Sequence, residues 1–473
     1  MERTFRIVKW MAAMASGPES ATETLAAVVE ACRYSGLGPT TRTRIREHVK
    51  DCLGVALAAS DTEPGRIVLG LVGEYAGDAG ARVIGSSIVT SPWEAAWANG
   101  TLSHLLDFDD NGFSHPTACI LPAALVTAEL ADASGQDFMV AMVAGWEVFE
   151  RLSRSVRAYE RTARKGGVHP TSIYGCPAAA AAGSKLLGLS REQTAIALGL
   201  ASSASGGLTE QFGTWGKGTQ AGNAARAGVM ASLLAQRGYW AAQTVIEGKH
   251  GLLSAFFGEG NFDLSLISEQ PGDTWAIETP GLNIKRFPAC GGTQRGIAAA
   301  LELRRQVVSD PADIDRIEVT GSESLFHSLH IDTPERGFEG KFSLRFCIAA
   351  AFADGDVTID TFTDQTLQRP EIQGLMRKIH TNVVPGGFEP GVRRYTTPVA
   401  VHMKNGASAS TVIDTPLGNI ANRMSYAQIT EKFMRCAARA LPAERVGPLN
   451  ETIDHLESSK IRDLLDCLTE VGQ

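Results

Sequence analysis

The hydrophobic pattern of this chain changes its period twice, and these changes constrain the fold more than any other feature of the sequence. The first half reads as one helix after another; Ile45, Val49 and Leu53, for example, recur at a helical spacing. Near residue 280 the pattern turns to the alternation that is typical of strands, and from Ser425 it is helical again. We therefore predict a mainly α protein with an inserted α+β domain, in which both chain ends form one large all-helical domain.

The length also requires more than one folding unit. A chain of 473 residues exceeds what one hydrophobic core usually serves, so about two or three units are expected. The start of the chain faintly resembles a signal peptide, and we interpret it as a disordered extension or an early start codon. The predicted division is a disordered extension over 1–23, the first part of the helical domain over 24–279, an α+β lid domain over 280–415, and the C-terminal part of the helical domain over 416–473.

Local patterns predict the individual elements. Helices are expected over Thr41–Ala59, Pro92–Leu106, Leu121–Ser134, Phe138–Arg154, Pro177–Lys185, Ala221–Ala235 and Phe342–Phe352, and a capping box at Ser190 opens a helix through Ala201. Strands are expected at Arg316–Thr320 and Val357–Thr361, and Asn405-Gly406 predicts a hairpin between Pro398–Lys404 and Ala407–Asp414. Two of these helices, Pro177–Lys185 and Ala221–Ala235, consist largely of small residues, which lets helix backbones pack closely in a core.

Charge and cysteine usage exclude several classes of protein. A formal net charge of -8 argues against a nucleic-acid binder, although a local basic pocket can still bind an anion. No apolar run reaches the roughly 18 residues that a membrane helix needs. The 8 cysteines include no C-x-x-C pair, which fits reduced thiols in the cytoplasm better than disulfides or a zinc cluster.

The most unusual polar segment runs from His104 to His115. Three carboxylates, Asp107, Asp109 and Asp110, lie between these two histidines where a predicted helix ends. A carboxylate beside a histidine can fix its tautomer and raise its basicity, as general acid-base catalysis requires. The same residues would also suit a solvated helix terminus with a capping role.

Three further segments place cationic or titratable groups near predicted helix starts or a domain junction. His169 follows two glycines, and Lys217 stands among glycines, each close to a helix N-terminus that favours anions. Lys285 and Arg286 are adjacent cations at the proposed domain junction and would suit a substrate carboxylate. A structural histidine and solvated cations remain the alternative interpretation of each segment.

Metal and dinucleotide sites are not predicted. His327 and His330 form a lone H-x-x-H without further ligands, and no H-E-x-x-H is present. No G-x-G-x-x-G follows a predicted strand, and Cys290 lacks the signature of a catalytic nucleophile. Acid-base chemistry on an anion, bound by lysines and without a cofactor, remains.

In order along the chain, these segments resemble the MmgE/PrpD family of dehydratases, decarboxylases and epimerases. The motifs are Ala98–Asp110 with His115-Pro-Thr, His169-Pro-Thr-Ser, Gly213–Arg226, Lys285–Cys290, Lys341–Arg345 and Arg423–Tyr426. The resemblance implies a homodimer, no metal or organic cofactor, and an active site between the helical domain and the lid. It implies that Asp107, His115, His169, Lys217 and Lys285 line the site, with the lysines binding carboxylates and the histidines moving protons.

The sequence departs from the family pattern around the implied pocket. Asn111 begins a short loop that lacks the usual threonine and histidine, and Cys290 stands where decarboxylases of the family have histidine. Gln294 replaces a histidine, and Phe346 stands where a pocket tyrosine can occur. We expect these four residues and Arg286 to contact the substrate, in a pocket altered from that of other members.

The sequence supports three functional hypotheses. The first is a lyase that removes water or carbon dioxide from a small di- or tricarboxylate after proton abstraction. The second is an isomerase that removes and returns one proton with the same residues. The third is a helical dimer that binds a metabolite without catalysis. Sequence alone does not separate the first two, and it does not assign the acid and the base among the histidines.

Overall fold

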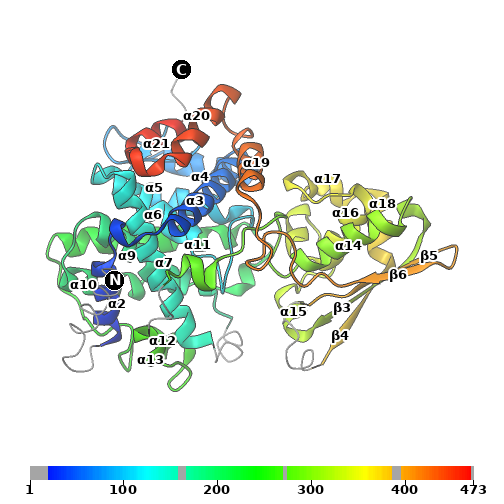
Figure 1. Ribbon diagram of the computed structural model, residues 1–473, viewed down its shortest axis with the longest axis horizontal. Coiled ribbons are helices and arrows are strands. Elements are labelled where there is room, and N and C mark those ends of the chain that lie inside the picture. The colour runs from blue at the N-terminus through cyan, green and yellow to red at the C-terminus, as the bar shows by residue number, and fades with distance from the viewer. Residues whose placement is uncertain (1–19, 158–166, 270–273, 386–395, 470–473) are drawn as a thin grey trace.

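The protein folds into two lobes of unequal size (Figure 1). The structure is a computed structural model that describes residues 20–157, 167–269, 274–385 and 396–469. The larger lobe is helical and contains both marked chain ends, whereas the smaller lobe contains a sheet covered by helices (Figure 1). One hydrophobic core runs from Ala21 to Leu468, and a second joins residues between Phe287 and Met403. The predicted fold class is confirmed; the boundaries at 280 and 415 stay a prediction.

The larger lobe takes its helices from both ends of the chain. Its helices are α2 (Ala21–Ala31), α3 (Pro39–Ser60), α4 (Glu63–Gly73), α5 (Pro92–Leu105), α6 (Thr117–Leu130), α7 (Gly135–Arg157), α9 (Pro170–Leu186), α10 (Arg191–Ser203), α11 (Gly216–Gln236), α12 (Leu252–Phe257), α13 (Ser265–Ser268), α19 (Tyr426–Ala437), α20 (Ala443–Asp454) and α21 (Ile461–Leu468). A short hairpin joins β1 (Ala81–Arg82) to β2 (Val89–Thr90). Single turns occur at Tyr34–Gly36, Thr209–Gln211, Ile277–Gly281 and Leu456–Ser458.

Helix caps confirm two of the predicted starts. At α10, the Ser190 hydroxyl accepts a hydrogen bond from the Gln193 amide, and the Gln193 side chain accepts one from Ser190 N–H, which is the predicted capping box. Ser425 caps α19 in the same way, where the helical pattern was predicted to resume. Helix α2 begins at Ala21, inside the segment predicted as an extension, and residues 1–19 lie outside the described residues.

The smaller lobe is an α+β unit. Its sheet has the order β4-β3-β5-β6, with β3 (Ile314–Ser322) parallel to β4 (Ile379–Val384) and antiparallel to β5 (Val399–Met403), which pairs with β6 (Ser408–Thr411). Its helices are α14 (Gln294–Val307), α15 (Glu323–Ser328), α16 (Leu344–Asp354), α17 (Asp364–Leu367) and α18 (Pro370–Lys378), with short 3-10 helices at Pro311–Asp313, Gly337–Phe342 and Ile359–Thr361. The β5–β6 hairpin and the β3 strand are thus confirmed. Helices α14, α16 and α18 lie on one side of the sheet (Figure 1).

The predicted strand Val357–Thr361 is wrong. A single turn of 3-10 helix occupies Ile359–Thr361 instead. The Thr358 N–H donates to the Thr361 hydroxyl at 2.9 Å, so a local side-chain contact satisfies the backbone that a strand would have paired.

Small residues let α5 and α11 cross with their backbones in contact. A Cβ atom on Gly222 would lie 2.4 Å from the Trp97 carbonyl oxygen, and one on Gly100 would lie 2.8 Å from the Gly222 Cα. In the first turn of α11, a Cβ on Gly218 would lie 3.1 Å from the Cα of Leu105, the last residue of α5. This contact places the start of α11 against the end of α5.

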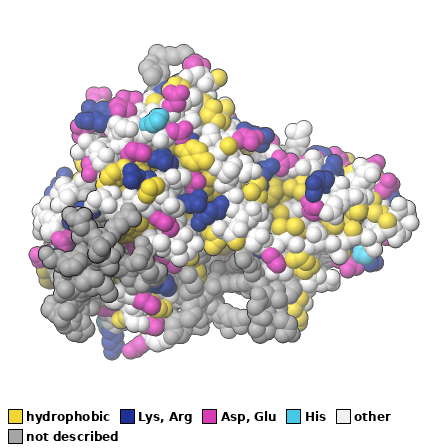
Figure 2. Space-filling view, viewed as in Figure 1, with side chains coloured by type: hydrophobic (Ala, Val, Ile, Leu, Met, Phe, Trp, Pro, Cys, Tyr) yellow, Lys and Arg dark blue, Asp and Glu magenta, His cyan; other side chains and the backbone are white. Residues whose placement is uncertain are grey.

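Figure 2 shows acidic and basic side chains mixed over one face of the molecule. Within the described residues, every helix is too short or too polar to cross a lipid bilayer.

The close approach of α5 and α11 generates a stability prediction. Gly222→Ala should lower the free energy of unfolding by about 1–3 kcal/mol, because the added methyl group has to displace backbone. Gly70→Ala is the matched control: it lies in α4 with nothing within 4 Å of the added carbon, and should be neutral or stabilise by about 0.5–1 kcal/mol. Urea unfolding followed by circular dichroism measures both. Equal effects of the two substitutions would contradict the close contact.

Candidate active site

A cavity of about 380 Å³ lies between the two lobes. The helical lobe contributes the loop between α5 and α6 and the N-terminal turns of α9 and α11. The segment that joins the two lobes (residues 283–292, the junction segment) and α15 supply the other wall. The cavity brings together eight of the ten predicted site residues: Asp107, Asn111, His115, His169, Lys217, Lys285, Cys290 and Gln294. Arg286 and Phe346 lie outside it.

Asp107 is the centre of the site. It follows the end of α5 in the left-handed backbone region (φ 49°), which aspartate tolerates better than most residues. Its Oδ1 accepts hydrogen bonds from Lys217 Nζ at 2.9 Å and Lys285 Nζ at 3.0 Å. Its backbone oxygen accepts a second bond from Lys285 Nζ at 2.6 Å. The buried Oδ2 atom has no hydrogen-bond partner among the described residues.

Opposite charges outweigh burial at this cluster. Burial alone raises the pKa of Asp107, but Lys217 and Lys285 together hold that pKa below its ordinary range. For Lys285, burial is the largest effect and lowers the pKa, but the Asp107 and Asp109 carboxylates, with a smaller effect of Cys290, more than offset it, so the net pKa is raised. Asp107 and Lys285 are therefore both charged at neutral pH.

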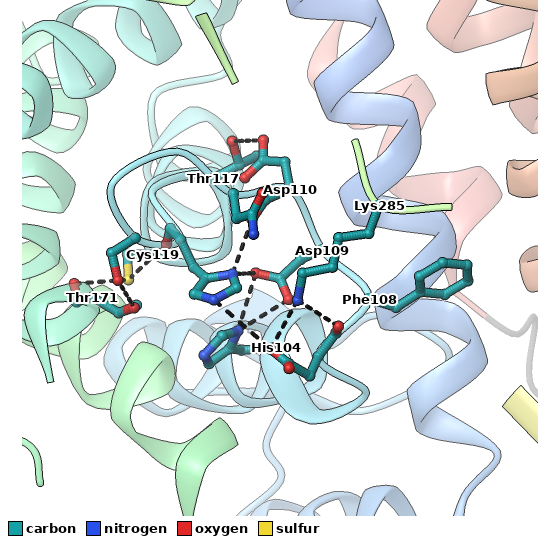
Figure 3. Close-up of polar contacts among 12 residues, drawn as sticks. His104, Phe108, Asp109, Asp110, Thr117, Cys119, Thr171 and Lys285 are labelled. Atoms are coloured by element: carbon teal, nitrogen blue, oxygen red, sulfur yellow. Dashed lines mark hydrogen bonds and ion pairs between the residues drawn. The ribbon is translucent and has the colours of Figure 1, made fainter. Parts of the chain in front are cut away.

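His104 is a neutral link between Lys217 and Asp109. Its Nε2 accepts from Lys217 Nζ at 2.6 Å, and because an ammonium group only donates, the ring proton is on Nδ1. Nδ1 donates to the Asp109 carboxylate at 3.0 Å (Figure 3). Burial lowers the pKa of His104 to about 4, against the opposing effect of Asp109. The imidazole is therefore uncharged near pH 7.

His115 has one ring nitrogen open toward the cavity. Its Nδ1 lies 2.9 Å from the Asp110 backbone oxygen and 3.1 Å from Asp109 Oδ2; both are acceptors, so Nδ1 carries the proton. Nε2 lies 3.8 Å from Asp107 Oδ1, beyond hydrogen-bond distance. Nε2 is thus the ring nitrogen that is left for a proton transfer, in a side chain that is 12% exposed.

His169, the residue before α9, uses both ring nitrogens. Gln220 donates its amide N–H to the Leu208 carbonyl at 2.9 Å, which turns its Oε1 toward His169 Nδ1 at 2.5 Å. His169 Nε2 then accepts from the Thr171 hydroxyl at 2.8 Å, and Thr171 is 2.5 Å from the Ser114 hydroxyl. Burial first, and then Lys217, hold the pKa of His169 well below its ordinary value. His169 is therefore neutral; it orients the Thr171 hydroxyl directly and the Ser114 hydroxyl through Thr171.

Of the three remaining predicted contact residues in the cavity, Asn111 and Gln294 make structural hydrogen bonds, and Cys290 has an unreactive thiol. Asn111 exchanges two backbone hydrogen bonds with Asn283, at 2.9 and 2.7 Å, which ties the acidic loop to the junction segment. The Gln294 amide donates to the carbonyls of Phe287 and Ala289 at 3.0 and 3.1 Å and so holds the turn before Cys290. Burial raises the pKa of the Cys290 thiol, which disfavours the thiolate that a nucleophile needs.

The two predicted residues outside the cavity have other surroundings. Arg286 borders a second cleft and pairs with Asp356 at 3.3 Å. Phe346 is fully buried in the core of the smaller lobe, where its ring centroid lies 5.8 Å from that of Phe362.

The predicted site set omits several residues that orient the others. His104 and Asp109 stand in the acidic segment, but sequence does not reveal which carboxylate faces the cavity and which faces the histidines. Gln220 lies three residues after Lys217, on the same face of α11, and this spacing is the one signal that could have pointed to it. Thr171 lies in the motif that begins with His169.

The cluster does not favour a metal ion. Ligand atoms of His104, Asp107, Asp109 and His115 lie within 4.8 Å of one another. However, two ammonium groups already occupy Asp107 Oδ1, and both ring nitrogens of His104 are engaged. A divalent cation at Asp107 would lie beside two lysine ammonium groups, whose positive charge would repel it.

The comparisons with known proteins cover most of the chain. The model of the MmgE/PrpD N-terminal domain matches residues 23–265, and that of the MmgE/PrpD C-terminal domain matches residues 287–457. Cis-aconitate decarboxylase of Homo sapiens is 27% identical over 461 residues, which cover 95% of this chain and 93% of the relative. Cis-aconitate decarboxylase of Aspergillus terreus is 28% identical over 82% and 84% of the two chains. 2-Methylcitrate dehydratase of Salmonella typhimurium is 23% identical over 88% and 90%.

The charge balance at Asp107 generates a second prediction. Asp107→Asn should destabilise the protein by about 3–5 kcal/mol at neutral pH, because it leaves two buried ammonium groups without their shared counter-charge. Asp360→Asn, which breaks the exposed ion pair with Arg439, is the control and should cost less than about 1 kcal/mol. Chemical denaturation of both variants gives the comparison. The charge account fails if Asp107→Asn unfolds at the same denaturant concentration as the control.

Proposed function

The chain belongs to the MmgE/PrpD family, and we propose that it is a lyase that removes water or carbon dioxide from a small di- or tricarboxylate. The named activities of its relatives, a decarboxylase and a dehydratase, support this class of reaction. The observation that carries the proposal is the pair of buried lysines that share Asp107 at the edge of the cavity.

The two lysines provide a binding site for a carboxylate. An ammonium group has three N–H donors, and contacts among the described residues use two on each lysine. One donor per lysine therefore remains for a substrate oxygen. The N-terminal turns of α9, α11 and α14 also border the cavity, through Pro170, Lys217 and Gln294, and helix N-termini favour anions.

His115 is the proposed acid-base residue. In a dehydration, its Nε2 takes a proton from the carbon next to a carboxylate, and the hydroxyl group on the neighbouring carbon leaves as water with the proton that the His115 ring gives back. In a decarboxylation, carbon dioxide leaves its electron pair on that carbon, and the protonated ring of His115 supplies the proton. Such a residue contributes about 10²–10⁴-fold to the rate.

The lysines stabilise the intermediate of either reaction. Both paths place negative charge on a carboxylate as an enediolate, and Lys217 and Lys285 are fixed donors at that charge. This is the role that a metal ion has in other lyases, so we propose a reaction without a metal or organic cofactor. His169 holds the Thr171 and Ser114 hydroxyls, and Ser114 lines the cavity as a hydrogen-bonding group for the substrate.

The test is proton NMR of the protein in D₂O with a panel of small carboxylic acids. Citrate, methylcitrates, aconitates, itaconate, malate, tartrates and aspartate-derived diacids should include one that yields a product with solvent deuterium on carbon. An epimer of the substrate instead of a product that has lost water or carbon dioxide would favour the isomerase. Binding without exchange or product would contradict the lyase and favour the metabolite-binding protein.

Two histidine variants assign the base on the substrate so found. His115→Gln should lower kcat by about 10²–10⁴-fold, because it removes the open ring nitrogen. His402→Gln is the matched control, since this histidine lies in β5 beside Glu318, away from the cavity, and should leave kcat unchanged. Full activity of His115→Gln would exclude His115 as the base.

A further inference from the structure

Lys432, a buried residue of α19, makes three charged or polar contacts that the reaction above does not use. Its Nζ atom lies 2.6 Å from Asp51 Oδ1 on α3. It also donates to the backbone oxygens of Phe108 at 2.8 Å and of Lys285 at 3.0 Å. The ammonium group lies 3.6 Å from the centroid of the Phe108 ring, and the side chain is 7% exposed. One carboxylate and two backbone oxygens therefore surround the ammonium group.

The two carbonyl groups belong to the segments that build the substrate site. Phe108 directly follows Asp107, and Lys285 is itself one of the two lysines on that carboxylate. These segments are 178 residues apart in the sequence. Lys432 therefore joins their backbones, while the Lys285 side chain joins the same segments at Asp107.

Lys432 reaches these segments from outside the active-site cavity. It is not among the residues that line the active-site cavity, and it borders a separate cleft between α19 and the smaller lobe. Helix α19 lies at the junction of the two lobes (Figure 1). Helix α19 thus contacts the segments that build the site without lining the cavity itself.

We propose that Lys432 is a positioning residue. It fixes the Asp107 loop and the Lys285 segment relative to one another from outside the cavity, and Asp51 balances its charge. This inference rests on the proposed lyase function. A displacement of about 1 Å at reacting groups can cost on the order of 10²-fold in rate, so loss of a residue that orients them should cost about 10–100-fold.

Lys50 is a matched control in the same pair of helices. It is the neighbour of Asp51 on α3, and its buried ammonium group donates to Thr430, Asn450 and Asp454 at 3.1, 2.7 and 2.6 Å. It also faces the Tyr426 ring, with 4.5 Å from Nζ to the centroid. Lys50 and Lys432 thus join the same two helices, α3 and α19, and each ammonium group has three polar partners. Of the two, Lys432 alone bonds to the Asp107 and Lys285 segments in the described structure.

The experiment compares Lys432→Met with Lys50→Met in the full-length protein. Both should lower the Tm, because each leaves buried acceptors unpaired. Lys432→Met alone should lower kcat, per folded protein, by about 10–100-fold on the substrate that the wild type converts. Hydrogen-deuterium exchange should also become faster in residues 106–112 and 283–290 in Lys432→Met and stay unchanged there in Lys50→Met.

The outcomes separate this inference from the proposed function. A wild type that converts no polycarboxylate would refute the lyase, while hydrogen exchange would still test whether Lys432 holds the two segments. An active wild type with equal kcat in Lys432→Met and Lys50→Met would overturn the positioning role. If Lys432→Met does not fold, Lys432→Gln is compared with Lys50→Gln by the same criterion.

Discussion

The carboxylate of Asp107 lies between two buried ammonium groups, and the arrangement of the site depends on this contact. Lys217 comes from the start of α11 and Lys285 from the junction between the lobes, so one side chain joins both walls of the cavity. Without the carboxylate, two like charges would be buried together. With it, the cluster keeps donors available for a substrate oxygen. The same interaction therefore stabilises the fold at this point and prepares the site for an anion.

The rest of the fold brings these three residues together. Glycines let α5 and α11 touch, and this contact sets Lys217 beside His104 and Asp107. The return of the chain to the helical lobe adds α19, whose Lys432 donates hydrogen bonds to the backbones of the Asp107 and Lys285 segments from outside the cavity. Asp109 and Asp110 accept from the histidines on the inner side of the loop, which leaves His115 Nε2 facing the cavity.

Sequence predicted the fold class, the helix starts at Ser190 and Ser425, and the four segments that meet in the cavity. It wrongly predicted a strand at Val357–Thr361, because the Thr361 hydroxyl accepts a backbone hydrogen bond that a neighbouring strand would otherwise have accepted. It also did not separate Lys285, which turns inward, from Arg286, which pairs with Asp356 outside. The assignment of the histidines required contacts across long separations, such as His104 with Lys217, 113 residues apart. Local patterns contain no information on such pairs.

The most direct test of this account is a crystal structure with propane-1,2,3-tricarboxylate, which has no hydroxyl group to lose. The account predicts one carboxylate within about 3 Å of both Lys217 Nζ and Lys285 Nζ. It also predicts that His115 Nε2 faces the carbon next to that carboxylate, while His169 keeps its bonds to Gln220 and Thr171. A ligand bound outside the cavity, or lysines that contact Asp107 and no ligand oxygen, would contradict the claim that Asp107 holds them ready for the substrate.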